Sequence, residues 1–133
     1  MSQRKLVTVG DLMVSELYSI DGLATVADAM AIMRQHGVNA LAVNRRDGTD
    51  EVGLVSVSDI ASDVIGPNRS PERVNVYEIM SKPVVTLPPE MLARYAVRLL
   101  VRFDISRAVV VDKDRNPLGI VTMRDLVLGQ GPE

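Results

Sequence analysis

Two short segments that resemble each other over seven residues place a hydroxyl side chain three residues before an aspartate. They are Ser56-x-x-Asp59 and Thr122-x-x-Asp125. A carboxylate has two acceptor oxygens, which can receive hydrogen bonds from the two neighbouring hydroxyls of a sugar. The same spacing is typical of a capping box, in which both side chains satisfy backbone N–H groups at a helix start. The two interpretations are compatible, and the residues alone leave both open.

Each of these segments belongs to a longer repeated pattern. Gly53–Asp59 and Gly119–Asp125 both read as glycine, two apolar residues, a hydroxyl residue, two variable positions and aspartate. The self-alignment extends over Val9–Ile65 and Val76–Leu128, and a polar segment with two prolines separates the copies. We therefore predict a first repeat over 1–65, a linker over 66–75, a second repeat over 76–128 and a tail over 129–133.

The elements that must position these residues follow the same order in both repeats. Each repeat reads as a short helical turn, a strand, a longer helix, two strands joined by a tight turn, and a closing helix. The expected strands are 17–20, 40–44 and 52–57, then 84–87, 108–112 and 118–122. This β-α-β-β-α order predicts an α/β (α+β) protein with two small sheets packed on helices.

The longer helices are defined by apolar stripes. The first is expected to start at Thr25 and to end at Gly37, because Val26, Ala29, Met30 and Met33 recur at helical spacing. In the second repeat Pro88 and Pro89 are expected to open the helix, where a missing N–H costs nothing. The matching stripe is Leu92, Tyr95, Ala96, Leu99 and Phe103.

Composition excludes several classes of function. The net charge is −2 and the chain has one Phe and no Trp, which argues against nucleic-acid binding. Without cysteine, and with His36 as the only histidine, neither a metal site nor a catalytic constellation is expected, so we predict a protein that is not an enzyme. No apolar run reaches the roughly 18 residues of a membrane span, and a cytoplasmic protein is expected.

The repeated motifs resemble the cystathionine-beta-synthase (CBS) domain family, specifically a tandem pair of such domains. The resemblance rests on the two glycine-to-aspartate motifs and on the openings Asp11-Leu12-Met13 and Glu78-Ile79-Met80. It covers nearly the whole chain. One departure is visible, because the strand after each long helix lacks the proline that the family often has there.

The resemblance implies a non-catalytic regulatory module that senses an adenosine-containing ligand. AMP, ADP or ATP would be the regulatory ligand, with S-adenosylmethionine or NAD as alternatives, and no cofactor is required. It also implies two clefts between repeats related by pseudo-twofold symmetry, a homodimer formed through helices, and a separate regulated protein. The alternative is an interaction module with empty clefts, whose aspartates only cap helices.

The resemblance also assigns candidate ligand-binding residues. Asp59, with Ser56 and Ser58, would face the segment before the second repeat's strands. Asp125, with Thr122 and Arg124, would face the equivalent segment of the first repeat. The residues expected opposite Asp59 are Ser81, Val84, Ser106 and Arg107, and those opposite Asp125 are Leu17, Asn39 and Ala40.

Charge makes the two expected clefts unequal. Arg107 stands where the family often has a phosphate-binding arginine, whereas the first repeat has Ala40 there. A guanidinium offers paired donors to phosphate oxygens, so the cleft of Asp59 and Arg107 is expected to be the better phosphate binder. Arg124 is expected to form an ion pair with its neighbour Asp125.

Overall fold

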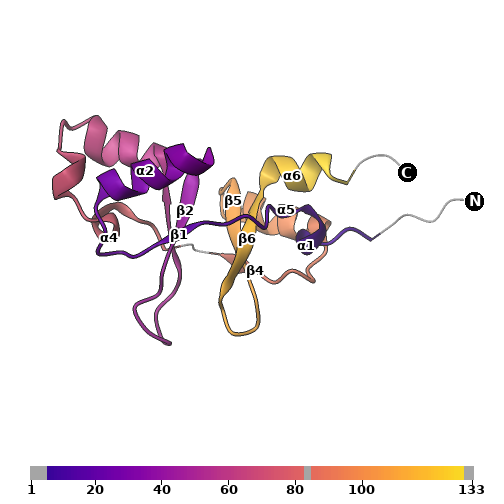
Figure 1. The fold of residues 1–133 in the computed structure, drawn as a ribbon. Coiled ribbons are helices and arrows are strands. Elements are labelled where there is room, and N and C mark those ends of the chain that lie inside the picture. Colours follow the sequence, from indigo (N-terminus) through magenta and orange to yellow (C-terminus); the bar gives the residue numbers. More distant parts are fainter. Residues whose placement is uncertain (1–5, 83–84, 131–133) are drawn as a thin grey trace, which may run out of the picture. The chain divides into compact units, whose positions relative to one another are not determined.

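The computed structural model describes residues 6–82 and 85–130, which divide into two compact units. The first unit contains residues 18–82, and the second combines residues 6–17 with residues 85–130 (Figure 1). The expected fold class is confirmed, since each unit contains a small mixed sheet with helices packed against it.

The sheet of the first unit has the strand order β1-β2-β3. Strand β1 is parallel to β2, and β2 is antiparallel to β3. The elements of this unit are β1 (Ser19–Ile20), α2 (Val26–His36), β2 (Ala40–Val43), β3 (Gly53–Ser56), α3 (Val57–Ile60), a π-helical turn η1 (Ala61–Ile65), a 3-10 turn η2 (Pro71–Arg73) and α4 (Val76–Ile79).

The second unit repeats this arrangement with the strand order β4-β5-β6. Here β4 is parallel to β5, and β5 is antiparallel to β6. Its elements are α1 (Val9–Leu12), β4 (Thr86–Leu87), α5 (Ala93–Arg102), β5 (Arg107–Val111), β6 (Pro117–Thr122) and α6 (Met123–Leu128). Both units therefore contain the predicted β-α-β-β-α order.

The opening helix of each repeat packs in the unit that holds the other repeat's sheet. Val9 of α1 is fully buried among residues of β4, α5 and β5, while Val76 of α4 is fully buried among residues of β1, α2 and β2. The backbone continues this exchange, because Val14 bridges to Ile120 in β6 and Ser81 bridges to Leu54 in β3. The compact units are thus not the sequence repeats themselves.

This exchange explains why both motifs begin with glycine. A Cβ built on Gly53 would lie 2.8 Å from the sulfur of Met80, and one on Gly119 would lie 3.1 Å from the sulfur of Met13. The first distance is shorter than side-chain carbons adopt, and the second is tighter than most of their contacts, so a side chain at either position would require the methionine to shift. The methionine that opens each repeat therefore packs against the motif glycine of the other, and the two features that carry the family resemblance touch each other.

The first long helix matches its prediction. Thr25 caps α2 in a capping box with Asp28, and Gly37 ends the helix in the left-handed conformation with φ of 64°. Val26, Ala29 and Met33 are buried, and Met30 packs against the same core. The apolar stripe read from the sequence therefore faces the interior of the first unit.

The second long helix differs from its prediction in its start and its buried face. Pro88 and Pro89 lie in the turn before α5, which begins at Ala93, so the expectation that they open the helix is wrong. The buried residues are Ala93, Ala96 and Leu100, whereas Tyr95 and Phe103 are each 46% exposed. Two arginine guanidiniums, of Arg94 and Arg98, lie 5.2 and 5.3 Å from the Tyr95 ring, which stabilises this exposed aromatic side chain.

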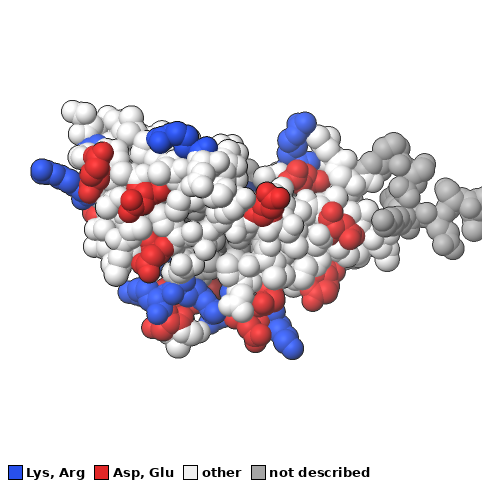
Figure 2. Space-filling model, viewed as in Figure 1, with Lys and Arg blue, Asp and Glu red and all other residues white. Residues whose placement is uncertain are grey.

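The surface carries both signs of charge. Figure 2 shows basic and acidic side chains interspersed over one face, with a mixed group at the loop between β2 and β3. That loop contains Arg45, Arg46, Asp47, Asp50 and Glu51. Within residues 6–82 and 85–130, no helix has both the length and the apolar character needed to cross a bilayer.

Candidate functional site

In the first unit, the Ser56–Asp59 motif lies at the junction of β3 and α3. Ala40 is the register partner of Ser56, and the Val57 N–H donates to the Asn39 carbonyl at 2.9 Å. Ser81 lies along the same strand, because its backbone forms a bridge with Leu54. The first unit thus brings together six of the predicted site residues: Asn39, Ala40, Ser56, Ser58, Asp59 and Ser81.

The second unit repeats this junction between β6 and α6. Arg107 is the register partner of Thr122, and the Met123 N–H donates to the Ser106 carbonyl at 2.8 Å. Arg107 is half-buried, while Arg124 and Ser106 are exposed. This unit holds Leu17, Ser106, Arg107, Thr122, Arg124 and Asp125, and the predicted site residue Val84 lies outside the described residues.

The two aspartates differ in how their carboxylates are used. Asp59 completes a capping box, in which its Oδ2 accepts hydrogen bonds from the Ser56 N–H and Ser56 Oγ, both at 2.9 Å. At the other junction the Thr122 hydroxyl accepts from the Asp125 N–H at 3.1 Å. Within the described part of the chain, the Asp125 carboxylate accepts no hydrogen bond and forms no ion pair. The expected Arg124–Asp125 ion pair is therefore wrong.

This difference bears directly on the choice between binding and capping. One Asp59 oxygen is committed to the backbone of its own cap, whereas both Asp125 oxygens are available to an external donor. Asp125 is half-buried, and a partly desolvated carboxylate forms stronger hydrogen bonds than one in bulk water. Among the described residues, both oxygens of the Asp125 carboxylate are therefore available as acceptors, whereas Oδ2 of Asp59 is already engaged by Ser56.

Apolar residues next to the strands of each junction pack against the hydrophobic cores. Val38 packs against the core of the first unit and Ile105 against that of the second. His36 is exposed and stacks on Tyr18 with ring centroids 3.8 Å apart. Among the residues that the structure describes, no group of histidine, cysteine, aspartate and glutamate side chains could hold a metal ion.

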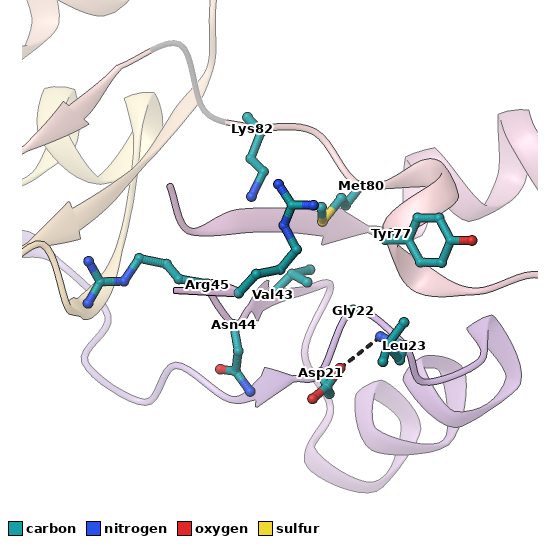
Figure 3. Close-up of a pocket in the computed structure, with 10 residues that line it drawn as sticks. Asp21, Gly22, Leu23, Val43, Asn44, Arg45, Tyr77, Met80 and Lys82 are labelled. Atoms are coloured by element: carbon teal, nitrogen blue, oxygen red, sulfur yellow. Dashed lines mark hydrogen bonds between the residues drawn. The ribbon is translucent and has the colours of Figure 1, made fainter. Parts of the chain in front are cut away.

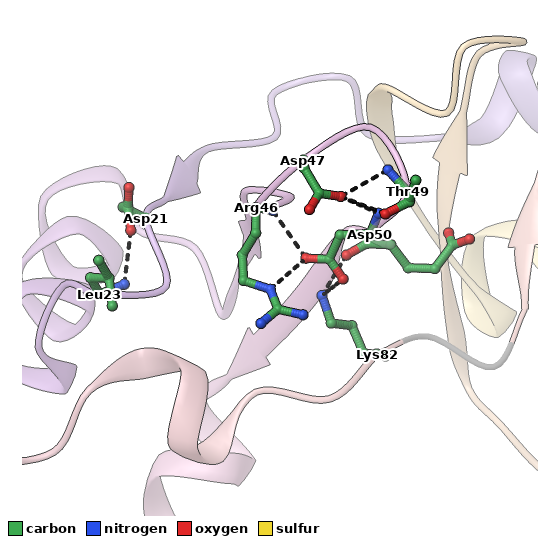
Figure 4. A network of polar contacts seen from close by, with 8 residues as sticks. Asp21, Leu23, Arg46, Asp47, Thr49, Asp50 and Lys82 are labelled. Atoms are coloured by element: carbon green, nitrogen blue, oxygen red, sulfur yellow. Dashed lines mark hydrogen bonds and ion pairs between the residues drawn. The ribbon is translucent and has the colours of Figure 1, made fainter.

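A polar cluster that sequence reasoning treated only as a turn is centred on Asp50. Its Oδ2 accepts from the Arg46 backbone N–H at 3.0 Å and from Arg46 Nε at 3.4 Å, while its Oδ1 lies 3.0 Å from Lys82 Nζ (Figure 4). The Asp50 side chain is only 11% exposed. The hydrogen bond from the Arg46 backbone, and then that from Lys82, lower the pKa of Asp50 far below its usual 3.8. The adjacent arginines at 45 and 46 were the sequence signal for this cluster.

The sequence places the chain in a known family. The CBS domain profile matches residues 9–66 and 76–129, so the chain belongs to the CBS domain family as a tandem pair. The chain is 30% identical over 122 residues to protein MK0525 of Methanopyrus kandleri, which covers 91% of this chain. It spans 61% of that relative and only 24% of a homoserine O-acetyltransferase from Methanocorpusculum labreanum, so these relatives contain further sequence.

Solved structures share this fold. A hexameric CBS-CP12 protein from bloom-forming cyanobacteria matches with a TM-score of 0.85 and 33% identity, over 94% of this chain and 72% of that one. The CBS domain pair of protein MJ0100, in complex with 5′-methylthioadenosine and S-adenosyl-L-methionine, matches with a TM-score of 0.76 and 22% identity, over 93% and 95% of the two chains. The cytosolic domain of the Mg²⁺ channel MgtE, in complex with ATP, matches with a TM-score of 0.74 and 23% identity, over 92% and 48%.

Proposed function

We propose that this CBS pair is a non-catalytic regulatory module that binds an adenosine-containing ligand at its strand–helix junctions. The observation that carries the proposal is the half-buried Asp125 carboxylate, whose oxygens accept no hydrogen bond from the described residues. A ribose supplies the two neighbouring hydroxyls that such a carboxylate can accept. The MJ0100 and MgtE complexes support this ligand class, since their ligands all contain adenosine.

The phosphates of AMP, ADP or ATP would be bound by arginine. Arg107 pairs in register with Thr122, three residues before Asp125, so a guanidinium and the carboxylate belong to the same unit. The pairing of Arg107 with Asp59 that the resemblance implies stays a prediction. S-adenosylmethionine carries no phosphate and would depend less on this arginine. The effect of an Arg107 substitution on affinity therefore distinguishes binding of AMP, ADP or ATP from binding of S-adenosylmethionine.

Regulation requires that the ligand bind one conformational state more tightly than another, because only differential affinity shifts an equilibrium. A separate protein, or further sequence such as that of the longer relatives, would respond to the change. We propose a cytoplasmic location for such a sensor, where adenine nucleotides are available. No catalytic residue is proposed.

We expect adenine nucleotides to stabilise the protein in a thermal shift assay with AMP, ADP, ATP, S-adenosylmethionine and NAD. A ligand at 100 times its dissociation constant adds about 2.7 kcal/mol to the free energy of unfolding. Asp125→Asn should weaken binding about 10- to 150-fold, as expected for loss of charge-assisted hydrogen bonds of about 1.5–3 kcal/mol. Calorimetric titration measures the affinity, and Arg107→Ala should weaken nucleotides more than S-adenosylmethionine.

The control for this experiment is Asp28→Asn. Asp28 forms the same kind of capping box as Asp59, but at the start of α2 and outside the predicted site. Asp28→Asn should lower stability by about 0.5–2 kcal/mol through loss of a cap, whereas Asp125→Asn removes no such bond, because the Asp125 carboxylate accepts none from the described residues. Only changes at the site residues should alter ligand affinity, so an equal effect of Asp28→Asn on affinity would contradict the assignment.

The second candidate function is an interaction module that binds no nucleotide, and the Asp59 capping box favours it. If Asp59 serves only its helix, its carboxylate has a complete structural explanation. Absence of stabilisation by every ligand of the panel at millimolar concentration would select this function over the sensor.

We also propose that the protein is a homodimer that associates through its helices. An apolar groove of about 290 Å³ lies on the helical face of the first unit, lined by Met30, Met33, Arg34, Val57, Ile60, Ala61 and Ile65. Ile65 is 53% exposed there, and its burial by a second copy would be favourable. Light scattering should give twice the 14.5 kDa chain mass, and Ile65→Glu should give the monomer with unchanged circular dichroism. A monomeric wild-type protein would refute the proposal.

A further inference from the structure

A second cavity lies in the first unit, at the opposite end of its sheet from Asp59. It encloses about 620 Å³, within the range of small-molecule sites. In the sheet register Ala40 lies beside Ser56, next to the predicted adenosine site, whereas Val43 lies beside Gly53 and lines this cavity. The lining residues, most of them labelled in Figure 3, are Asp21, Gly22, Leu23, Val43, Asn44, Arg45, Arg46, Tyr77, Met80 and Lys82. We call this cavity the β2-end groove.

One part of the groove is apolar and accessible. Val43 is buried, and Met80 packs against the core beside it. Leu23 and Tyr77 line the groove while remaining 75% and 51% exposed. Figure 3 shows the Tyr77 ring and Leu23 on the same side, away from the end of the Arg45 side chain. A flat apolar group could therefore lie against these side chains and remove their surface from water.

The other part of the groove carries organised positive charge. Asp50 holds Arg46 through Nε and Lys82 through Nζ, so one carboxylate orients two cations (Figure 4). Lys82 Nζ also donates to the Glu51 carbonyl, which fixes the ammonium group further. One positive charge of the pair remains unbalanced by Asp50. The Arg46 Nη groups, which take part in no hydrogen bond among the described residues, remain available as donors.

The charge of the groove contrasts with that of the chain. Its lining contains three cations and the single carboxylate Asp21, although the whole chain has a net charge of −2. Asp21 is turned toward its own loop, since its Oδ1 accepts from the Leu23 N–H at 2.8 Å (Figure 3). The cavity thus combines a cationic wall with an apolar wall, a combination suited to an anion that carries an apolar body.

We propose that the β2-end groove binds a small phosphate monoester with a planar apolar body. The phosphate would accept hydrogen bonds from Arg46 and Lys82, and the planar body would lie against Leu23, Tyr77 and Met80. No ribose recognition is involved, because the carboxylate that faces the two cations is already engaged by them. The site is therefore independent of the junctions at Asp59 and Asp125.

The test uses 1-naphthyl phosphate, which has the phosphate and the planar body but no sugar. Methyl NMR signals of Leu23, Val43 and Met80 should shift on titration. Inorganic phosphate alone and 1-naphthol alone should each bind at least about 10-fold more weakly, because each satisfies only one wall of the groove. Arg46→Gln and Lys82→Gln should each weaken 1-naphthyl phosphate about 5- to 10-fold, as expected for partly exposed charge-assisted contacts.

Matched controls separate this site from the rest of the protein. Arg73→Gln removes an exposed arginine of the same unit outside the groove and should leave the affinity unchanged. Asp125→Asn should also leave the affinity for 1-naphthyl phosphate unchanged. Failure of the adenosine proposal would therefore not affect the proposal for the β2-end groove. Arg46 is 85% exposed, and its variant should fold normally even if Lys82→Gln does not. Unshifted methyl signals, or equal binding of 1-naphthol, would overturn the proposal.

Discussion

Replacing Leu100 with alanine should lower the free energy of unfolding by about 2.7–5 kcal/mol, the range measured for fully buried leucines. Leu100 lies on α5, is completely inaccessible and belongs to the core of the second unit with Val110 and Val121. Truncation to alanine loses the transfer free energy of three side-chain carbons. It also leaves a cavity that the surrounding strands can only partly close. Leu41→Ala should have a similar effect through the core of the first unit.

Urea denaturation monitored by circular dichroism measures this effect. Leu23→Ala is the control, because Leu23 is 75% exposed and its truncation should change stability by less than about 0.5 kcal/mol. If Leu100→Ala cost less than about 1 kcal/mol, Leu100 could not be the central side chain of its core. The buried face of α5 would then be the stripe read from the sequence, with Leu92 and Leu99 inside.

A methyl group at position 119 should strongly destabilise the second unit. A Cβ there would lie 2.5 Å from the Val14 carbonyl oxygen, and backbone cannot move aside as a flexible side chain can. We expect Gly119→Ala to lower stability by about 2–4 kcal/mol, through overpacking and loss of the backbone pairing at this point. Two hydrogen bonds are at risk. The Val14 N–H donates to the Ile120 carbonyl at 2.8 Å, and the Ile120 N–H donates to the Val14 carbonyl at 3.1 Å.

Hydrogen exchange of the Val14 and Ile120 amides, together with urea denaturation, measures this prediction. Both amides should exchange faster in Gly119→Ala than in the wild type. The control is Gly48→Ala in the loop between β2 and β3, where an added Cβ would meet no atom within 4 Å. Unchanged exchange at Val14 in Gly119→Ala would show that the opening segment does not pair with β6 as the structure has it.

Local features of the fold could be read from the sequence because neighbouring residues determine them. The cap formed by Thr25 and Asp28, the end of α2 at Gly37 and the strand pair joined at Arg45–Asp50 depend on contacts within a few residues. The start of α5 does not follow from the sequence, because a proline pair is compatible both with a helix start and with a turn before it. The apolar character of Tyr95 and Phe103 predicts burial, but both side chains are 46% exposed.

The candidate site also has features that the local sequence predicts and features that it does not. The Ser-x-x-Asp and Thr-x-x-Asp spacing was sufficient to predict a hydroxyl and a carboxylate at each strand–helix junction, since both lie in one short segment. That Asp59 completes a capping box while the Asp125 carboxylate receives no such bond could not be read from two equivalent motifs. The β2-end groove was missed because Asp50 and Lys82 lie 32 residues apart in sequence.

The two CBS repeats can be recognised without coordinates, because the duplication and the glycine-to-aspartate spacing are properties of the amino-acid order. The packing of each repeat's opening helix in the unit of the other repeat's sheet is visible only in three dimensions, where Met80 contacts Gly53 and Met13 contacts Gly119. The physical reason is that strand pairing at a sheet edge and burial of an apolar surface depend on complementarity between segments that lie far apart in the chain. Local pattern predicts that an apolar turn must be buried, but it does not say against which sheet.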